Sequence, residues 1–226
     1  MPVKPVTHTA PMLLFDLDGT LVDSAPDLAG AANDLRILHG MQPLPYADLR
    51  PMVGTGARGM VGVAFGVTPT DERFAALRDA FLARYSERLL DSTQVFAAMQ
   101  PVLDELDAAG FRWGIVTNKA MRFAAPLVEG LGLAHRTAVL IAGDSTPFAK
   151  PHPEPLLEAA RRLGIAPARC VYVGDDERDI VAGRAAGMRT LAAAWGYLGQ
   201  GEPVAAWGAD QVLSSPVELL KWLELA

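Results

Sequence analysis

Residues 12–24 read Met-Leu-Leu-Phe-Asp-Leu-Asp-Gly-Thr-Leu-Val-Asp-Ser, and this stretch decides the fold. Four apolar residues run without a breaker into Asp16, which is typical of a buried strand in a parallel sheet. Asp18 follows two positions later, so both carboxylates point to the same side of an extended chain. Gly19 and Thr20 then end the apolar run. Open α/β sheets bind their ligands at this carboxyl end of the strands.

Two carboxylates this close to one another need a neutralising partner. Like charges at this spacing are costly unless a cation or a shared proton relieves the repulsion. Asp16 and Asp18 therefore predict a metal ion, a shared proton, or both. The alternative is that the two acids simply open a surface turn. A calcium-binding EF-hand loop is excluded, because its glycine stands at the sixth position whereas Gly19 stands at the fourth.

Length and composition favour a globular protein with a sizeable core. The chain has 226 residues, 50% hydrophobic and 20% charged, which suits one large domain or a domain with an insert. The net charge of −6, with both signs interspersed, argues against a nucleic-acid partner, which needs a basic face. No apolar run approaches the roughly 20 residues of a membrane span, and residues 1–11 lack a signal-peptide core. We expect a cytoplasmic protein without a membrane partner, residues 1–11 forming a loose leader.

A long helical insert separates the first strand from the next one, expected at 112–117. This separation greatly exceeds the dozen or so residues that a crossover between parallel strands needs. Apolar residues repeat at helical spacing over 26–38 and again from Phe74 to Tyr85, where Thr70 is the expected N-cap. We therefore expect an α-helical cap domain at 25–95, lying over the active site as a lid. The core domain would comprise residues 1–24 and 96–226.

Strands and helices alternate after the insert. The expected strands are 111–117, 138–142, 170–174, 189–194 and 211–213. The expected helices are 101–109, 120–131, 153–163, 178–186 and 216–225. Such alternation predicts an α/β fold with a doubly wound parallel sheet, a Rossmann-like core that carries the inserted cap. The single cysteine, Cys170, lies in an apolar strand and is expected to be a small core residue.

Polar residues with suitable chemistry follow three of these strands. Thr117 and Asn118 stand between a strand and a helix, where a hydroxyl and free backbone amides can bind phosphate. Lys150 stands beside prolines and supplies a compact cation. Asp175, Asp176 and Asp179 follow the strand 170–174. Oxygen ligands of this kind suit Mg2+. The alternatives are that the threonine caps a helix and that the acids form a solvated helix start.

The segment Asp16-x-Asp18-Gly19-Thr20 resembles the first motif of the haloacid dehalogenase-like phosphohydrolases. The later motifs of that family match in order at Thr117, Lys150-Pro-x-Pro and Gly174-Asp175, and the resemblance covers residues 12 to 213. It implies that Asp16 is the nucleophile and that Asp18 is the general acid and base. The metal Mg2+ would then be held by Asp16, by Asp175 and by the backbone carbonyl of Asp18.

The resemblance also implies roles for the remaining site residues. Thr117 and Lys150 would bind the phosphoryl group, together with Gly19 and Asn118. Asp179 would orient Lys150 or a metal-bound water, with Asp176 as a further residue behind the site. The segment Gly56-Ala57-Arg58 falls in the cap, where the family has a substrate-specificity turn, so Arg58 becomes a candidate substrate contact. The Gly-x-Gly-x-x-Gly pattern at 54–59 lacks a preceding strand, which argues against dinucleotide binding.

The function that this resemblance implies is hydrolysis of a small phosphorylated metabolite through an aspartyl-phosphate. Within the family the chain looks most like the phosphoglycolate phosphatases. Segments 56–58, 113–114 and 207–210 are similar to the N-acetylmuramic acid 6-phosphate phosphatases of cell-wall recycling, so an amino-sugar phosphate is the alternative substrate. A sugar phosphomutase is a third possibility, since it uses the same two aspartates. A metal-binding scaffold without activity is the remaining alternative.

Overall fold

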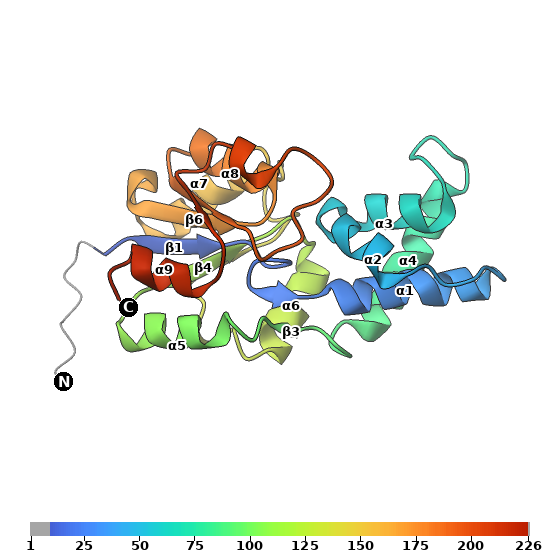
Figure 1. Cartoon of the computed structure of the whole chain (residues 1–226). Coiled ribbons are helices and arrows are strands. Elements are labelled where there is room, and N and C mark those ends of the chain that lie inside the picture. Colours follow the sequence, from blue (N-terminus) through green and yellow to red (C-terminus); the bar gives the residue numbers. More distant parts are fainter. Residues whose placement is uncertain (1–9, 226) are drawn as a thin grey trace.

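The structure is a computed structural model that describes residues 10–225 (Figure 1). The greater part of the expected leader at 1–11 lies outside the described residues. The main sheet is parallel throughout, with the order β5-β4-β1-β6-β7-β8. Its strands are β1 (Met12–Phe15), β4 (Trp113–Val116), β5 (Leu140–Ile141), β6 (Cys170–Gly174), β7 (Arg189–Ala193) and β8 (Gln211–Leu213). The expected doubly wound parallel sheet is confirmed.

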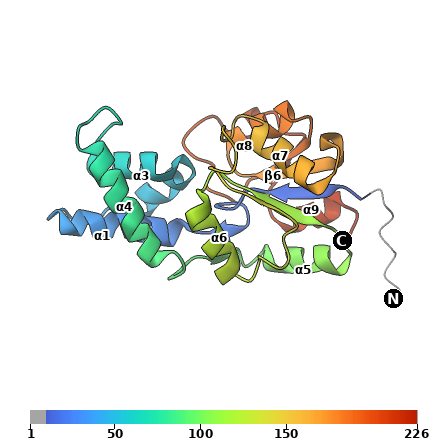
Figure 2. The ribbon, with the colours of Figure 1, turned by 180° about the vertical axis from the view of Figure 1, so that it is seen from behind.

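The central strand β1 is buried on both faces, as its unbroken apolar sequence predicts. Its side chains alternate between two hydrophobic clusters. Leu13 and Phe15 belong to one cluster, which also contains residues of α5 (Gln100–Ala108), α6 (Met121–Gly130) and α9 (Val217–Trp222). Met12 and Leu14 belong to the other, which contains residues of α7 (Glu154–Leu163) and α8 (Glu177–Ala185). Figures 1 and 2 show these two sets of helices on opposite sides of β1.

A group of helices stands beside the sheet, and we call its members the cap helices (Figures 1 and 2). They are α1 (Ala25–Leu38), α2 (Tyr46–Leu49), the 3-10 helix η1 (Arg50–Thr55), α3 (Gly56–Phe65) and α4 (Phe74–Arg88). Helices α1 and α4 pack against each other, and the apolar stripe of α4 is buried as expected. None of the described helices is both long and apolar enough to cross a membrane. The division of the chain at 25–95 stays a prediction.

The connection between core and cap helices contains elements that the sequence analysis did not expect. Strands β2 (Val22–Asp23) and β3 (Gln94–Val95) pair antiparallel, so the chain leaves and re-enters the core at the same place. The Asp27 side chain is fully buried beside them. It accepts hydrogen bonds from the backbone N–H of Thr93 at 2.8 Å and from the Thr93 hydroxyl at 2.7 Å. These hydrogen bonds connect the start of α1 to the segment at Thr93 that leads back to the core.

The expected N-cap at Thr70 is wrong. Helix α4 begins at Phe74 and its N-cap position is Arg73. The Asp71 carboxylate accepts from the backbone N–H of Arg73 at 2.9 Å, and forms a local turn before the helix. Short polar side chains favour such turns as well as caps, so the polar residues from Thr70 to Asp71 precede the helix and do not cap it. The last helix is shorter than expected and ends at Trp222.

Gly19, in the turn after β1, allows the chain to approach Asp175 closely. Its φ of +86° lies in the left-handed region that residues with a Cβ avoid. A Cβ on Gly19 would also overlap the carboxylate of Asp175. The Thr20 hydroxyl next in sequence donates to Asp175 Oδ1 at 2.9 Å. The Gly-Thr pair therefore joins the end of β1 to the end of β6.

We predict that Gly19→Ala destabilises the protein more than Gly40→Ala does. Gly40 also has a positive φ, +70°, but no atom lies where its Cβ would be. Both substitutions should cost about 1 kcal/mol or more in backbone strain. Gly19→Ala should lose about 1–3 kcal/mol more through the overlap with Asp175. Urea unfolding of both variants measures the difference, and equal losses would contradict the close approach.

Candidate active site

The carboxyl ends of the central strands converge on one cavity of about 410 Å3, between the sheet and the cap helices. Asp16 follows β1, Thr117 follows β4 and Asp175 follows β6, as the parallel topology requires. Lys150 reaches the same cavity from the loop before α7. Four residues that the sequence motifs singled out, on four separate segments, therefore line a common space.

Three carboxylates meet at the floor of the cavity. Oxygen atoms of Asp16, Asp175 and Asp179 all lie within 4.8 Å of one another. Burial, followed by the charges of Asp16 and Asp179, raises the pKa of Asp175 well above its ordinary value. Burial also raises the pKa of Asp179, although Lys150 opposes this effect. The negative charges of the cluster are therefore unfavourable unless nearby cations neutralise them.

The only lysine inside this cluster within the described residues is Lys150, and its side chain is 2% exposed. Its Nζ lies 2.9 Å from Asp16 Oδ1 and 2.7 Å from Asp179 Oδ1. It also donates to the Tyr172 hydroxyl at 2.6 Å and to the Val116 carbonyl at 3.0 Å. Burial alone would lower the pKa of Lys150, but the two carboxylates outweigh burial and raise it. Lys150 is therefore held as a fixed cation beside Asp16.

The residues of the cluster fit a metal ion. Asp16 Oδ1 is buried and, apart from its ion pair with Lys150, has no hydrogen-bond partner among residues 10–225. Such an atom is costly unless another group satisfies it. One lysine also leaves the three carboxylates incompletely neutralised. Carboxylate oxygens are the ligands that hard divalent cations prefer. Asp16 and Asp175, with Asp179 beside them, can therefore hold a divalent cation.

The side chain of Asp18 lies apart from this cluster. Both of its oxygens lie 2.9 Å from Lys119 Nζ, and Oδ1 also accepts from the Ser24 hydroxyl. Burial would lower the pKa of Lys119, but Asp18 and Tyr85 outweigh it and raise that pKa. Asp18 lines the cavity above Asp16 on the same strand end. Its side chain is not a member of the carboxylate cluster, and its role as general acid and base stays a prediction.

Asn118, expected at the phosphate, lines the cavity, and its side chain contacts the backbone of Lys150. Its role in phosphate binding stays a prediction. Its amide nitrogen donates to the Lys150 carbonyl at 2.9 Å, and its oxygen accepts from the Lys150 N–H at 2.9 Å. Both ends of the amide are therefore used to hold the lysine loop. Thr117 is buried at the cavity wall, and its hydroxyl accepts from the Lys119 N–H at 3.1 Å. The phosphate role of Thr117 stays a prediction.

Of the remaining expected site residues, Asp176 lines the cavity, whereas Gly19 and Arg58 do not. Gly19 packs against Asp175 and does not line the cavity. Asp176 is the N-cap of α8 and forms an ion pair with Arg178, and Asp179 completes the capping box by accepting from the Asp176 N–H at 3.1 Å. Arg58 is exposed and is not among the residues that line the cavity, and its role as a substrate contact stays a prediction.

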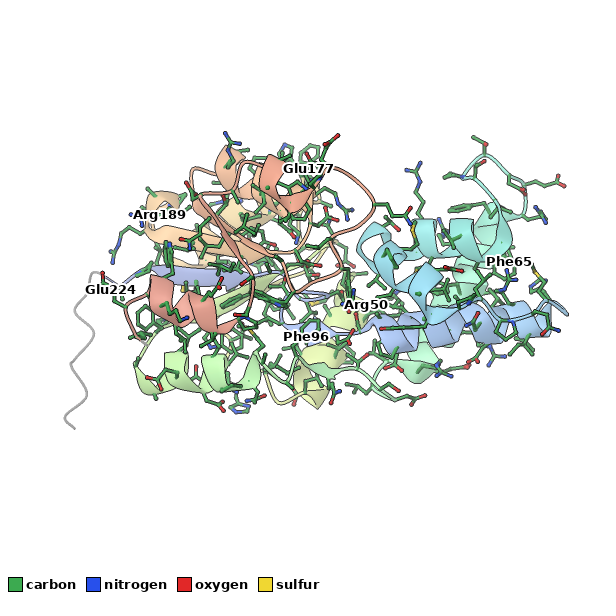
Figure 3. The ribbon with its side chains drawn as sticks, in the orientation of Figure 1. Arg50, Phe65, Phe96, Glu177, Arg189 and Glu224 are labelled. Atoms are coloured by element: carbon green, nitrogen blue, oxygen red, sulfur yellow. The ribbon has the colours of Figure 1, made fainter. Side chains whose placement is uncertain are left out.

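Two arginines join the cap helices to the core at the rim of the cavity. Arg178 of α8 donates to the carbonyl of Gly54 in η1. Arg50 lies where the cap helices meet the core (Figure 3), with its guanidinium 4.9 Å from the centre of the Tyr197 ring. The Tyr197 N–H in turn donates to Asp175 Oδ2 at 2.8 Å. The cap helices thus contact the segments that hold the acidic cluster.

Sequence reasoning missed four residues of the site: Lys119, Tyr85, Tyr172 and Tyr197. Lys119 directly follows the Thr-Asn pair, and a lysine there was a usable signal. Tyr85 belongs to an apolar helical stripe and Tyr172 to an apolar strand, where an aromatic ring is expected in the core. No signal distinguished them, because only the tertiary structure shows where a tyrosine hydroxyl points.

Comparison with known proteins agrees with this geometry. The model of the haloacid dehalogenase-like hydrolases matches residues 13–193. A phosphoglycolate phosphatase of Xanthomonas campestris pv. campestris is 48% identical over 208 residues, which cover 92% of this chain and 93% of the relative. An N-acetylmuramic acid 6-phosphate phosphatase of Pseudomonas aeruginosa is 42% identical over 214 residues, 95% of each chain.

A solved structure supports the same assignment. The crystal structure of a predicted phosphoglycolate phosphatase from Haemophilus somnus superposes with a TM-score of 0.84 at 27% identity. The superposition covers 95% of this chain and 98% of the chain of that crystal structure. The family match spans most of the chain and includes the segments that carry Asp16, Thr117, Lys150 and Asp175. The chain therefore belongs to the haloacid dehalogenase-like hydrolase family.

Proposed function

We propose that the protein is a Mg2+-dependent phosphomonoesterase that works through an aspartyl-phosphate on Asp16. The observation that carries this proposal is the position of Asp16. Its carboxylate lies at the floor of the cavity, 2.9 Å from the buried Lys150 ammonium, and shares its surroundings with Asp175 and Asp179. A nucleophile needs access to substrate, and a phosphoryl group needs cations beside it. The relatives named as phosphatases support the same reaction.

The proposed reaction consists of two successive displacements at phosphorus, in which different residues have different roles. Asp16 attacks phosphorus, the bond from phosphorus to the ester oxygen breaks, and Asp18 gives its proton to the departing alcohol. Asp18 then takes a proton from the water that attacks the same phosphorus and releases Asp16. Lys150 and Thr117 stabilise the charge on the transferred oxygens. When bound at the acidic cluster, Mg2+ would supply further neutralisation of that charge.

The first candidate substrate is 2-phosphoglycolate. The relative with 48% identity is named a phosphoglycolate phosphatase, as are several others. The ester is small and has two anionic groups, a phosphate and a carboxylate. Local cations must attract it because the chain carries a net charge of −6. Lys119, Lys150 and Arg178 line the cavity in ion pairs with acids. Arg122, which has no ion pair among the described residues, and a bound metal would provide that local attraction.

A second candidate, N-acetylmuramic acid 6-phosphate, is favoured by the size of the cavity. Its volume of about 410 Å3 is within the range of pockets that enclose ligands much larger than a two-carbon acid. Leu28, Phe81 and Leu82 of the cap helices give it apolar walls that suit the face of a sugar ring. A relative with 42% identity carries the name of this activity.

We predict that Asp16→Asn lowers the turnover of p-nitrophenyl phosphate at least about 1000-fold, because an amide cannot accept the phosphoryl group. The control is Asp79→Asn, the same change on an exposed face of α4, where the side chain is 66% exposed. Release of p-nitrophenol in the presence of Mg2+ measures both variants. Turnover by Asp16→Asn at the native rate would remove Asp16 from the role of nucleophile.

We predict that the protein hydrolyses 2-phosphoglycolate with a higher kcat/KM than N-acetylmuramic acid 6-phosphate. Phosphate release, measured side by side at several concentrations of each ester, gives the two values. The reverse order would assign the protein to the amino-sugar phosphate and would agree with the cavity volume. Release of phosphate from neither ester would contradict both assignments.

A further inference from the structure

The Tyr85 hydroxyl is a buried polar group without a hydrogen-bond partner in the part of the chain that the structure describes. Tyr85 lies on α4, is 2% exposed and lines the cavity. Its hydroxyl has no hydrogen-bond partner among residues 10–225. Burial raises the pKa of this hydroxyl to about 12, so it stays protonated and can donate. Buried hydroxyls in native proteins are nearly always hydrogen-bonded, so an unpaired one facing a cavity indicates a ligand.

The tyrosine ring is held by packing that does not involve the hydroxyl. The ring stacks on Phe81 of the same helix, with centroids 6.5 Å apart, and tilts against Phe123 of α6 at 5.4 Å. Lys119 Nζ faces the ring, 4.8 Å from its centroid. An ammonium can only donate, so Lys119 offers no acceptor for the hydroxyl proton. These contacts fix where the hydroxyl points. A phenylalanine at this position would keep all of them.

The part of the cavity around Tyr85 carries two cations that can receive an anion. Lys119 binds both oxygens of Asp18, but an ammonium has three N–H donors and one remains. Arg122 of α6 lines the cavity, and its guanidinium stacks on the Phe123 ring at 4.7 Å. The ion pairs formed by the described residues do not include Arg122. The acids nearest to Tyr85 are Asp18, which is paired with Lys119, and Asp27, which is hydrogen-bonded to Thr93.

We propose that Tyr85, Lys119 and Arg122 form a subsite for a carboxylate on the non-phosphate end of the substrate. The inference rests on the proposed phosphatase function and adds a requirement to it, namely a second anionic group on the ester. The Tyr85 hydroxyl donates to the carboxylate, Arg122 supplies a charge without an acidic partner, and Lys119 supplies its remaining donor. A planar guanidinium and a fixed hydroxyl together favour a planar carboxylate over a hydroxyl group.

The subsite bridges the core and the cap helices. Tyr85 comes from α4, whereas Lys119 and Arg122 come from the core segment after β4. A carboxylate bound there contacts both parts while the phosphate end of the same molecule reaches Asp16. The acid group of the ester would thus be selected by the cap and the core together, and the phosphate by the core alone. This division explains how a cap helix that has no contact with phosphorus can restrict the substrate.

The test compares esters that differ in the carboxylate. One pair is 2-phosphoglycolate and 2-hydroxyethyl phosphate. The other is N-acetylmuramic acid 6-phosphate and N-acetylglucosamine 6-phosphate, which lacks the lactyl acid. The pair containing the better substrate is used. The measured quantity is the ratio of kcat/KM for the ester with the carboxylate to kcat/KM for the ester without it. Tyr85→Phe should lower this ratio about tenfold to a hundredfold, the usual contribution of a hydrogen bond to a charged group. Arg122→Gln should lower it in the same direction.

The matched control is Tyr46→Phe, which removes the same hydroxyl from a cap residue that is 43% exposed and outside the cavity lining. Its ratio should equal that of the native protein. An unchanged ratio in Tyr85→Phe, or an equal loss on both esters of the pair, would overturn the subsite and leave Tyr85 with a packing role.

A binding measurement separates failure of this inference from failure of the proposed function. Calorimetric titration of Asp16→Asn with each ester of the pair gives affinities that do not depend on turnover. Adding Tyr85→Phe to that protein should reduce the affinity ratio by a similar factor. Absence of phosphate release from the native protein would refute the phosphatase alone. An affinity ratio that does not respond to Tyr85→Phe would refute the subsite alone.

Discussion

The structure depends on one concentrated electrostatic interaction, the ammonium of Lys150 beside the carboxylates of Asp16 and Asp179 with Asp175 next to them. Burying charges is expensive, and a buried ion pair persists only where geometry and further hydrogen bonds compensate for lost hydration. One ammonium does not balance three carboxylates. The residues of the cluster can therefore hold a second cation, which would also offset the charge of a bound phosphate.

Neighbouring residues hold this unfavourable arrangement in place. The Asn118 side chain fixes the backbone of Lys150, and the Thr20 hydroxyl and Tyr197 N–H fix the two oxygens of Asp175. The Tyr197 hydroxyl accepts from the Ser24 and Ala25 N–H groups at the start of α1, at 2.8 and 3.0 Å. The same residue therefore contacts both the acidic cluster and the first cap helix. A displacement of the first cap helix would therefore also displace Tyr197 and its hydrogen bond to Asp175.

The sequence predicted the parts of the fold that depend on local pattern. The buried strand Cys170–Gly174 has the expected bounds, and Asp16, Thr117, Lys150 and Asp175 meet as the parallel topology requires. The motif resemblance supplied the family, which the comparisons confirm. The cap was less predictable. Arg58 does not line the cavity, whereas Tyr85 does. Helical spacing predicts which residues are buried, but it does not predict which buried hydroxyl lacks a partner among the described residues.

The most direct test of the central claim is the Mg2+ dependence of unfolding. A cation that binds the folded cluster alone should stabilise it, by about 2.7 kcal/mol at 100 times its Kd. We predict that the unfolding temperature of the metal-free native protein rises with Mg2+ and falls again with excess chelator. Asp175→Asn should show no such rise, because one of the proposed ligands is gone. An unfolding temperature that ignores Mg2+ in the native protein, or an equal rise in both proteins, would contradict the claim.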